Sequence, residues 1–255
     1  MNIINANRII NDKVKDEMVN GYEIKEPFPF KIIDNFFTDE ILDKIMDDVQ
    51  ELKTKHADYV FYDSSWEKNK YAFTKYYNLK PLLLGIFKYL NSNEFINYLE
   101  KLTGINDIIR EDISLQGAGI HRILNDGFLN IHSDFNSYYS DKYGKLDRRI
   151  NLLIYLNPDW KDEYNGHLLL CDNKTNEVKY KIKPILNRCV IFNTSKHSLH
   201  GHPEPLCLPE GRVRESIAVY YYTMRKGNVD FEGDDDRPTL IYPTEIFDKK
   251  NERII

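Results

Sequence analysis

The sequence contains few cysteines, and they form no recognisable motif. Of its 255 residues only Cys171, Cys189 and Cys207 are cysteines. Their number is odd and their spacing contains no Cys-x-x-Cys pair, which excludes the redox and zinc motifs built on that pair. A chain with such scattered cysteines is more typical of a reduced intracellular compartment than of an oxidising one.

Long apolar runs and a strong charge of one sign are also lacking. The first twenty residues carry Asn, Lys, Asp and Glu throughout, without the apolar core of a signal peptide, and no later run approaches the length of a membrane span. The net charge of −5 gives no support for broad attraction to nucleic acid, and no nucleic-acid motif is present. We therefore expect a cytoplasmic protein without membrane or nucleic-acid partners.

The stretch 128–134 places a His and an Asp two residues apart in a predicted strand. Because successive strand side chains alternate between faces, His132 and Asp134 point into the same space. Leu129 and Ile131 stand between the polar positions, as in a short strand with one apolar face. An imidazole and a carboxylate placed in this way can provide two ligands of one metal ion.

A third ligand is available further along, in the segment 192–202, which contains His197, His200 and His202. Two His and one carboxylate leave other coordination positions of a divalent ion open. This is the facial triad of non-haem Fe(II) oxygenases rather than a closed structural zinc site.

A β-rich run beginning at Arg214 offers an anchor for an anionic co-substrate. The positions that share one face of this predicted strand are Arg214, Ser216, Ala218, Tyr220 and Tyr222. Small neighbours such as Ser216 and Ala218 leave room for a bidentate contact between the guanidinium and a carboxylate.

Several motifs follow one another in order along the chain. They are His132-x-Asp134, Arg148-Arg-Ile-Asn-Leu-Leu-Ile-Tyr-Leu-Asn-Pro-Asp-Trp160, Asn165-Gly-His, Leu199-His-Gly201 and Arg214-x-Ser216. Together they resemble the prolyl 4-hydroxylase branch of the Fe(II)/2-oxoglutarate-dependent dioxygenases. The resemblance covers about residues 113–223, and the run from Tyr155 to Trp160 is far more specific than the metal pair.

The resemblance implies a double-stranded β-helix, or jelly roll, with an iron site inside it. It places His132, Asp134 and His200 on the iron, and it selects His200 because the family motif is His-Gly before the arginine strand. It also implies that Arg214 binds the C5 carboxylate of 2-oxoglutarate and that the hydroxyl of Tyr155 helps to hold it.

The resemblance leaves open the roles of several other residues near these motifs. Some members carry a Thr at the position of Ala218, so we assign that hydroxyl to Ser216 and add Asn151 to the candidate cofactor-binding residues. His197 and His202 remain alternative candidates for the third ligand. The simpler interpretation is that each is a polar loop residue beside the site. For His121 an indirect or substrate-facing role is the expectation.

We expect a mainly β protein with a supporting α layer. A polar lead-in, 1–29, precedes a single dioxygenase domain, 30–255. Within that domain we predict a helical support at 38–104, a jelly-roll core at about 113–223 and a docked C-terminal tail at 224–255.

Local patterns predict individual elements within this arrangement. We expect a strand at 30–37, a helix after Thr38, an irregular aromatic segment covering core at 53–78, helices at 79–90 and 92–102, a strand at 113–123, a mobile polar loop at 135–147, and strands at 149–156, 168–171, 179–183 and 188–193.

The implied activity is Fe(II)- and 2-oxoglutarate-dependent hydroxylation, with O2 as oxidant and ascorbate as reductant. The resemblance favours prolyl residues in a protein or peptide as the substrate. Alternatives are a free amino acid or another small metabolite, including glycan and natural-product intermediates, and a non-catalytic jelly-roll binding module. Because Asp134 is present, we exclude halogenation, for which relatives replace this carboxylate to make room for a halide.

Overall fold

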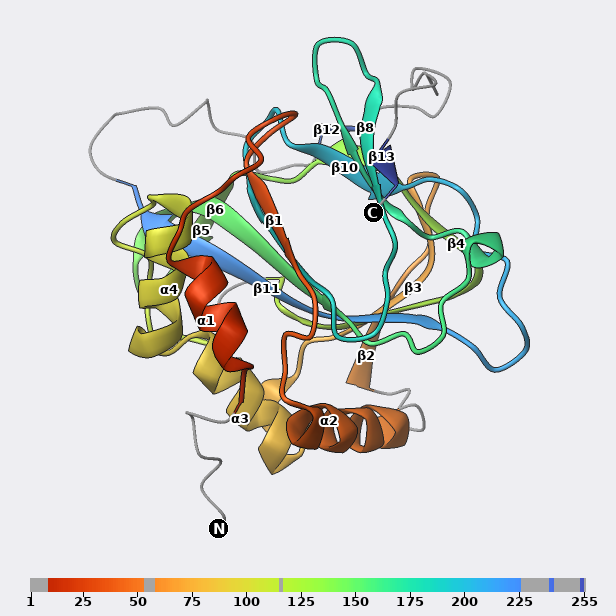
Figure 1. Cartoon of the computed structure of the whole chain (residues 1–255), viewed down its shortest axis with the longest axis horizontal. Helices are drawn as coiled ribbons and strands as arrows, with labels where there is room; N and C mark the ends of the chain where they lie inside the picture. Colours follow the sequence, from red (N-terminus) through yellow and green to blue (C-terminus); the bar gives the residue numbers. More distant parts are fainter. Residues whose placement is uncertain (1–8, 53–57, 115–116, 226–238, 241–252, 255) are drawn as a thin grey trace.

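A curled sheet with helices gathered against one side makes up most of the computed structural model (Figure 1). The structure describes residues 9–52, 58–114, 117–225, 239–240 and 253–254. In these ranges no helix has both the length and the apolar character needed to cross a bilayer.

The strands of the sheet run antiparallel except at one edge, where β13 lies parallel to β8. Their order is β1 (Phe30–Ile33), β9 (Cys189–Asn193), β6 (Gly144–Tyr155), β11 (Arg214–Met224), β4 (Gly119–Ser133), β10 (Leu199–His202), β7 (Leu168–Cys171), β8 (Val178–Ile182) and β13 (Arg253–Ile254). Off this path, β2 (Tyr59–Tyr62) pairs with β3 (Glu67–Phe73), β3 and β12 (Thr239–Leu240) pair with β4, and β5 (Ser137–Ser140) pairs with β6. This curled antiparallel sheet with a few helices confirms the predicted fold class.

Strand β4 is the central element, because it pairs with β11 along its first part, with β3 between Ile120 and Leu129, and with β10 near its end. The sequence predicts two separate strands at 113–123 and 128–134, whereas the structure has one continuous strand, β4. The pairing with β10 sets His200 directly opposite His132, so residues far apart in sequence become neighbours.

Strand β11 separates the core from the interior of the curl, as its alternation predicts. Ile217, Val219 and Tyr221 belong to the large apolar cluster that includes the helices. Arg214 and Ser216 line a cavity on the other face.

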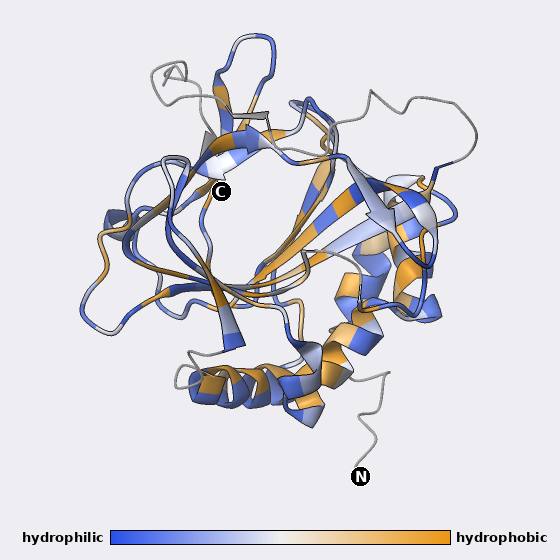
Figure 2. Ribbon diagram, turned by 180° about the vertical axis from the view of Figure 1, so that it is seen from behind, coloured by the Kyte–Doolittle hydropathy of each residue, from blue (hydrophilic) through white to orange (hydrophobic). Residues whose placement is uncertain are grey.

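In the described residues the helices are α1 (Asp12–Met18), α2 (Asp39–Leu52), α3 (Pro81–Leu90) and α4 (Asn93–Thr103), and short 3-10 turns cover Tyr76–Asn78 and Asp162–Tyr164. The Ser92 hydroxyl accepts a hydrogen bond from the Phe95 amide at the start of α4, and Gly104 ends that helix with φ +70°. Helices α2, α3 and α4 thus confirm the predicted ones. Hydrophilic and hydrophobic residues alternate along α2 and α4 (Figure 2), which fits helices with one face against the core.

The lead-in is more ordered than predicted from residue 9 onward. Helix α1 begins where the Asn11 side chain accepts a hydrogen bond from the Lys13 amide, and it buries Val14 and Met18. Seven residues among polar neighbours give too short an apolar pattern to stand out in the sequence. Residues 1–8 lie outside the described part of the chain.

Two segments predicted to be irregular form hairpins instead. Residues 59–73 contain β2 and β3, and Phe61 and Tyr71 face each other across them with ring centres 4.6 Å apart. Phe61 is 49% exposed, so the prediction that these aromatics cover core is wrong for this residue. The predicted mobile loop 135–147 contains β5 and the start of β6, joined by a turn in which Gly144 has φ +74°.

The C-terminal segment is described only in two short pieces. Strand β12 pairs with β4, and β13 pairs with β8. The remainder of the predicted tail after residue 225, including the acidic run 234–236, lies outside the described residues.

Candidate metal site and its cavity

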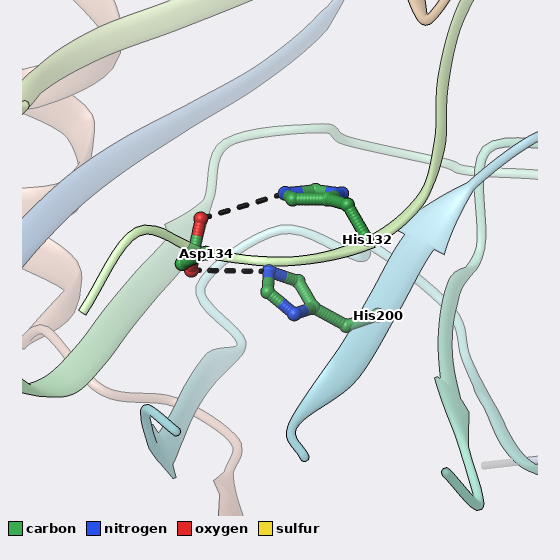
Figure 3. A group of neighbouring side chains, drawn as sticks. All are labelled: His132, Asp134 and His200. Carbon is green, nitrogen blue, oxygen red and sulfur yellow. Dashed lines mark ion pairs between the residues drawn. The ribbon is translucent and has the colours of Figure 1, made fainter. Parts of the chain in front are cut away.

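Strands β4 and β10 bring His132, Asp134 and His200 together. One ligand atom from each lies within 4.8 Å of the other two. Nε2 of His132 is 3.4 Å from Oδ1 of Asp134, and Nε2 of His200 is 3.4 Å from Oδ2 (Figure 3). The carboxylate thus presents one oxygen to each imidazole.

Backbone carbonyls fix the orientation of both imidazoles. Nδ1 of His132 lies 2.8 Å from the Asn130 carbonyl oxygen, and Nδ1 of His200 lies 2.8 Å from that of Ser198. A carbonyl oxygen only accepts hydrogen bonds, so both Nδ1 atoms carry the proton and both Nε2 lone pairs remain available. Metal-binding imidazoles are oriented in this way, and the donor set therefore fits a divalent metal ion.

The charge states of the cluster also suit a cation. Burial on its own would raise the pKa of Asp134, but Arg148 and the two imidazoles more than offset this and hold that pKa well below its usual range. Burial lowers the pKa of His200 to about 4, despite the opposing effect of Asp134. An ionised carboxylate and a neutral imidazole are the forms that bind metals.

Asp134 is supported by two neighbours on β6. Its Oδ2 accepts a hydrogen bond from Asn151 Nδ2 at 2.6 Å and forms an ion pair with Arg148 Nη2 at 3.0 Å. Asn151 Oδ1 accepts from Nε and Nη2 of the same guanidinium, which lies 3.6 Å from the centre of the Tyr220 ring. Asn151, predicted to bind a cofactor, thus contacts both the candidate metal-binding carboxylate and Arg148.

A cavity of about 990 Å³ opens beside the cluster. Besides the three candidate ligands it is lined by residues of β3, β4, β6, β10 and β11 and of the β2–β3 hairpin, among them Phe61, Tyr62, Trp66, Lys70, His121, Arg148, Asn151, His202, Arg214, Ser216 and Tyr220. The predicted anchor residues Arg214 and Ser216 therefore share a cavity with the metal cluster.

Arg214 is a buried cation, with 5% of its surface exposed. Its Nε donates to the Gly166 carbonyl at 2.8 Å, and its guanidinium carbon lies 5.1 Å from the centre of the Tyr155 ring. Within the described part of the chain no carboxylate pairs with it. Burial lowers the pKa of Arg214 and raises that of Tyr155, and the interaction between the two side chains opposes both shifts. An anionic ligand would offset the cost of burying the Arg214 charge and the Tyr155 hydroxyl.

The remaining histidines are placed differently from His200. His197 is exposed, and its Nδ1 lies 2.6 Å from Asn173 Nδ2. His121 and His202 line the cavity without joining the cluster. Of the three candidates for the third ligand, the structure brings only His200 to the carboxylate.

Sequence reasoning missed the role of Arg148. A β-bulge at Arg149 lets Tyr221 pair with Ile150 and Tyr222 pair with Arg148. The extra residue moves Arg148 onto the face that carries Asn151, against the simple alternation of a strand. No residue pattern in the sequence marks this bulge.

The sequence model of the 2OG-Fe(II) oxygenase superfamily matches residues 118–222. Among solved structures, the chain is similar to a prolyl hydroxylase from Trichoplax adhaerens in complex with a hypoxia inducible factor oxygen degradation domain peptide fragment. The identity is 18%, the TM-score is 0.57, and the match covers 84% of this chain and 90% of that one.

Two bacterial structures are also similar. A Pseudomonas putida prolyl-4-hydroxylase matches with 11% identity and a TM-score of 0.56, over 84% of this chain and 98% of that one. HygX from Streptomyces hygroscopicus, with nickel, 2-oxoglutarate and hygromycin B bound, matches with 14% identity and a TM-score of 0.52, over 88% and 96%. At these identities the structural likeness shows a shared fold, and residues 118–222 are similar in sequence to the 2OG-Fe(II) oxygenase superfamily.

Proposed function

We propose that the protein is an Fe(II)- and 2-oxoglutarate-dependent hydroxylase. His132, Asp134 and His200 would hold the iron, and Arg214 would bind the C5 carboxylate of 2-oxoglutarate with help from Tyr155. One observation carries this proposal: a single cavity joins a donor set of two His and one carboxylate to a buried guanidinium that no described carboxylate neutralises.

Bound iron and 2-oxoglutarate supply the oxidation, in which the oxo acid becomes succinate and CO2 while one oxygen atom of O2 enters a substrate C–H bond. The chain's own residues position the reactants. Arg148 and Asn151 hold Asp134 in one orientation, and the carbonyls of Asn130 and Ser198 keep both imidazoles in the tautomer that a metal needs. Ascorbate would serve as the external reductant.

At the other end of the co-substrate, burial strengthens the contact to Arg214. A guanidinium–carboxylate pair shielded from water has a stronger Coulomb attraction than one at the surface. Ser216 lies across from Tyr155 in the β11–β6 pairing and lines the same cavity. Its hydroxyl is the proposed third contact to the carboxylate.

We propose prolyl residues in a protein or peptide as the substrate. The β2–β3 hairpin contributes Phe61, Tyr62 and Trp66 to the lining of the cavity, and the exposure of Phe61 places it on the surface. Aromatic rings at an open rim provide apolar surface for a pyrrolidine ring and the neighbouring peptide. The likeness to two prolyl hydroxylases, one of them crystallised with a peptide, supports this choice.

A small molecule is the second candidate substrate. The cavity is large enough for a drug-sized ligand, and HygX, which has a similar fold, was crystallised with hygromycin B. A free amino acid and intermediates of glycan or natural-product pathways belong to this class. A binding module without turnover is the third possibility.

Succinate formation tests the proposal. Protein loaded with Fe(II) under anaerobic conditions is mixed with 2-oxoglutarate, ascorbate and O2, alone and with proline-containing peptides, free amino acids or nucleotide sugars. Stimulation by one of these sets identifies the substrate class. If the protein formed no succinate and bound no 2-oxoglutarate, whether or not iron was present, the result would support the binding module instead.

Arg214 distinguishes this reaction from a dioxygenase that uses no 2-oxoglutarate. We expect Arg214→Ala to raise the apparent KM for 2-oxoglutarate by about a hundredfold, because a charge-assisted bidentate contact is lost. An unchanged KM, measured from succinate release, would exclude Arg214 as the anchor.

A further inference from the structure

His202 is a buried polar side chain with no partner for either ring nitrogen among the described residues. Only 3% of its surface is exposed, and it lines the same cavity as the metal cluster. His132 and His200 differ from it, because each has Nδ1 on a backbone carbonyl. Buried polar atoms without partners are rare in folded proteins, since each costs the desolvation of that atom.

The backbone of β10 lies close against β4 beside this residue. His200 pairs with His132 and His202 pairs with Leu129, with a register shift between the two pairs. A Cβ at Gly201 would lie 2.7 Å from the Asn130 carbonyl oxygen, so the strand packs tightly against β4 at this point. His200 and His202 both line the cavity, two positions apart on one strand.

The surroundings of His202 link the two ends of the proposed co-substrate site. Besides His202, this cavity is lined by Lys70, His132 and Arg214. His202 therefore shares one cavity with the proposed carboxylate anchor and with one metal ligand. An imidazole ring has an N–H with which it can donate a hydrogen bond.

We propose that His202 is a co-substrate-binding residue, which donates a hydrogen bond to the distal carboxylate of 2-oxoglutarate beside Arg214. A molecule bound between the metal cluster and Arg214 would lie in the cavity that His202 lines. A primary substrate is expected at the exposed aromatic rim of the β2–β3 hairpin instead. His202 would thus help the site to select 2-oxo acids that carry a second carboxylate.

Because this role depends on the proposed function, binding is measured separately from turnover. Calorimetric titrations use protein with Mn(II), which occupies such sites without supporting the oxidation. The ligands are 2-oxoglutarate and 2-oxopentanoate, which has the same carbon chain and chelating head but a methyl group in place of the distal carboxylate. The variants are His202→Leu, which removes both nitrogens, and His202→Gln, which retains an N–H donor.

We expect His202→Leu to weaken 2-oxoglutarate binding about tenfold or more, as for loss of a hydrogen bond to a charged group. Binding of 2-oxopentanoate should change by less than about twofold, since it lacks the group that His202 contacts. His202→Gln should restore most of the lost affinity. Without ligands, the Tm of His202→Leu should equal or exceed that of the wild type, because two unpaired buried polar atoms are removed.

Unchanged 2-oxoglutarate affinity in a folded His202→Leu or His202→Met protein would overturn this role. An equal loss for both ligands would also overturn it, because His202 would then act through the metal cluster. If the wild type itself bound no 2-oxoglutarate, the proposed function would fail along with this inference. Wild-type binding together with full binding by His202→Leu would reject the role of His202 alone.

Discussion

At the residue scale, Asp134 is the side chain on which most contacts of the site converge. Each of its oxygens faces one imidazole, and Oδ2 also accepts a hydrogen bond from Asn151 and forms an ion pair with Arg148. The guanidinium charge offsets the buried carboxylate, and the amide fixes its rotation. Such supporting contacts commonly determine metal affinity as strongly as ligand geometry does.

The amide of Asn151 should therefore matter for metal affinity. We expect Asn151→Ala to weaken Mn(II) binding about tenfold or more, because Asp134 loses a hydrogen bond that orients it. Thr194→Val is the matched control, since the Thr194 hydroxyl donates to Asn151 Oδ1 rather than to Asp134. Titrations of the metal-free proteins provide the measurement. Equal Mn(II) affinities of Asn151→Ala and the wild type would show that Asp134 is oriented without this amide.

Arg148 contributes a buried charge that Asp134 requires when no metal is bound. We expect Arg148→Met to lower the free energy of unfolding of the metal-free protein by about 3 kcal/mol, because the carboxylate loses its charged partner. Saturating Mn(II) should reduce this loss, since the metal provides a second counter-charge. Urea unfolding with and without Mn(II) measures both values. Arg149→Met is the control. If Arg149→Met lowered the free energy of unfolding as much as Arg148→Met does, a specific role of Arg148 would be contradicted.

At the scale of elements, the β5–β6 hairpin is fastened to the loop before β4. Asp112 accepts hydrogen bonds from Lys142 Nζ at 2.9 Å and from the Tyr143 hydroxyl at 3.0 Å, and it also binds the Ser114 amide and hydroxyl. Ser114 lines the cavity, as does Tyr138 of β5. The contact at Asp112 therefore holds together two segments that border the cavity.

This contact should give stability a dependence on acid pH. Burial raises the pKa of Asp112, but hydrogen bonds from Ser114, Lys142 and Tyr143 outweigh it and lower the pKa to about 2. Because the folded-state pKa is depressed, the stabilisation is complete above the unfolded value of about 4 and is lost as the pH falls towards 2.

We expect Asp112→Asn to lower the Tm near neutral pH, and the difference from the wild type to shrink between about pH 4 and pH 2. Asp141→Asn is the control, because Asp141 is an exposed carboxylate in the same turn. Thermal unfolding across this pH range measures the effect. A Tm difference that stays constant with pH would mean that Asp112 acts through something other than its charge.

At the scale of the whole molecule, the sequence predicts the features that depend on the alternation of side chains along a strand. The shared face of His132 and Asp134 and the inward face of β11 follow from strand periodicity. The choice of His200 among three histidines came from the resemblance, since it depends on the pairing of β10 with β4. The bulge at Arg149 and the β2–β3 hairpin depend on contacts with distant strands and leave no clear pattern in the sequence.

Binding of a metal and of 2-oxoglutarate at the two ends of the proposed site should also raise the thermal stability of the whole protein. A ligand that binds only the folded state at a hundred times its Kd adds about 2.7 kcal/mol, or roughly 5–10 °C in Tm for a chain of this size. We expect Mn(II) alone to raise the Tm, and 2-oxoglutarate to raise it further only when Mn(II) is present. Thermal scans with each ligand alone and with both together measure these increments.

Arg214→Met should keep the increase caused by Mn(II) and lose the further increase caused by 2-oxoglutarate, because the variant retains the metal ligands but not the carboxylate anchor. Arg212→Met is the matched control, since Arg212 donates to the Pro158 carbonyl in a region exposed to solvent. If Arg214→Met kept the whole 2-oxoglutarate increment, the buried guanidinium would not be the group that holds the far end of the co-substrate.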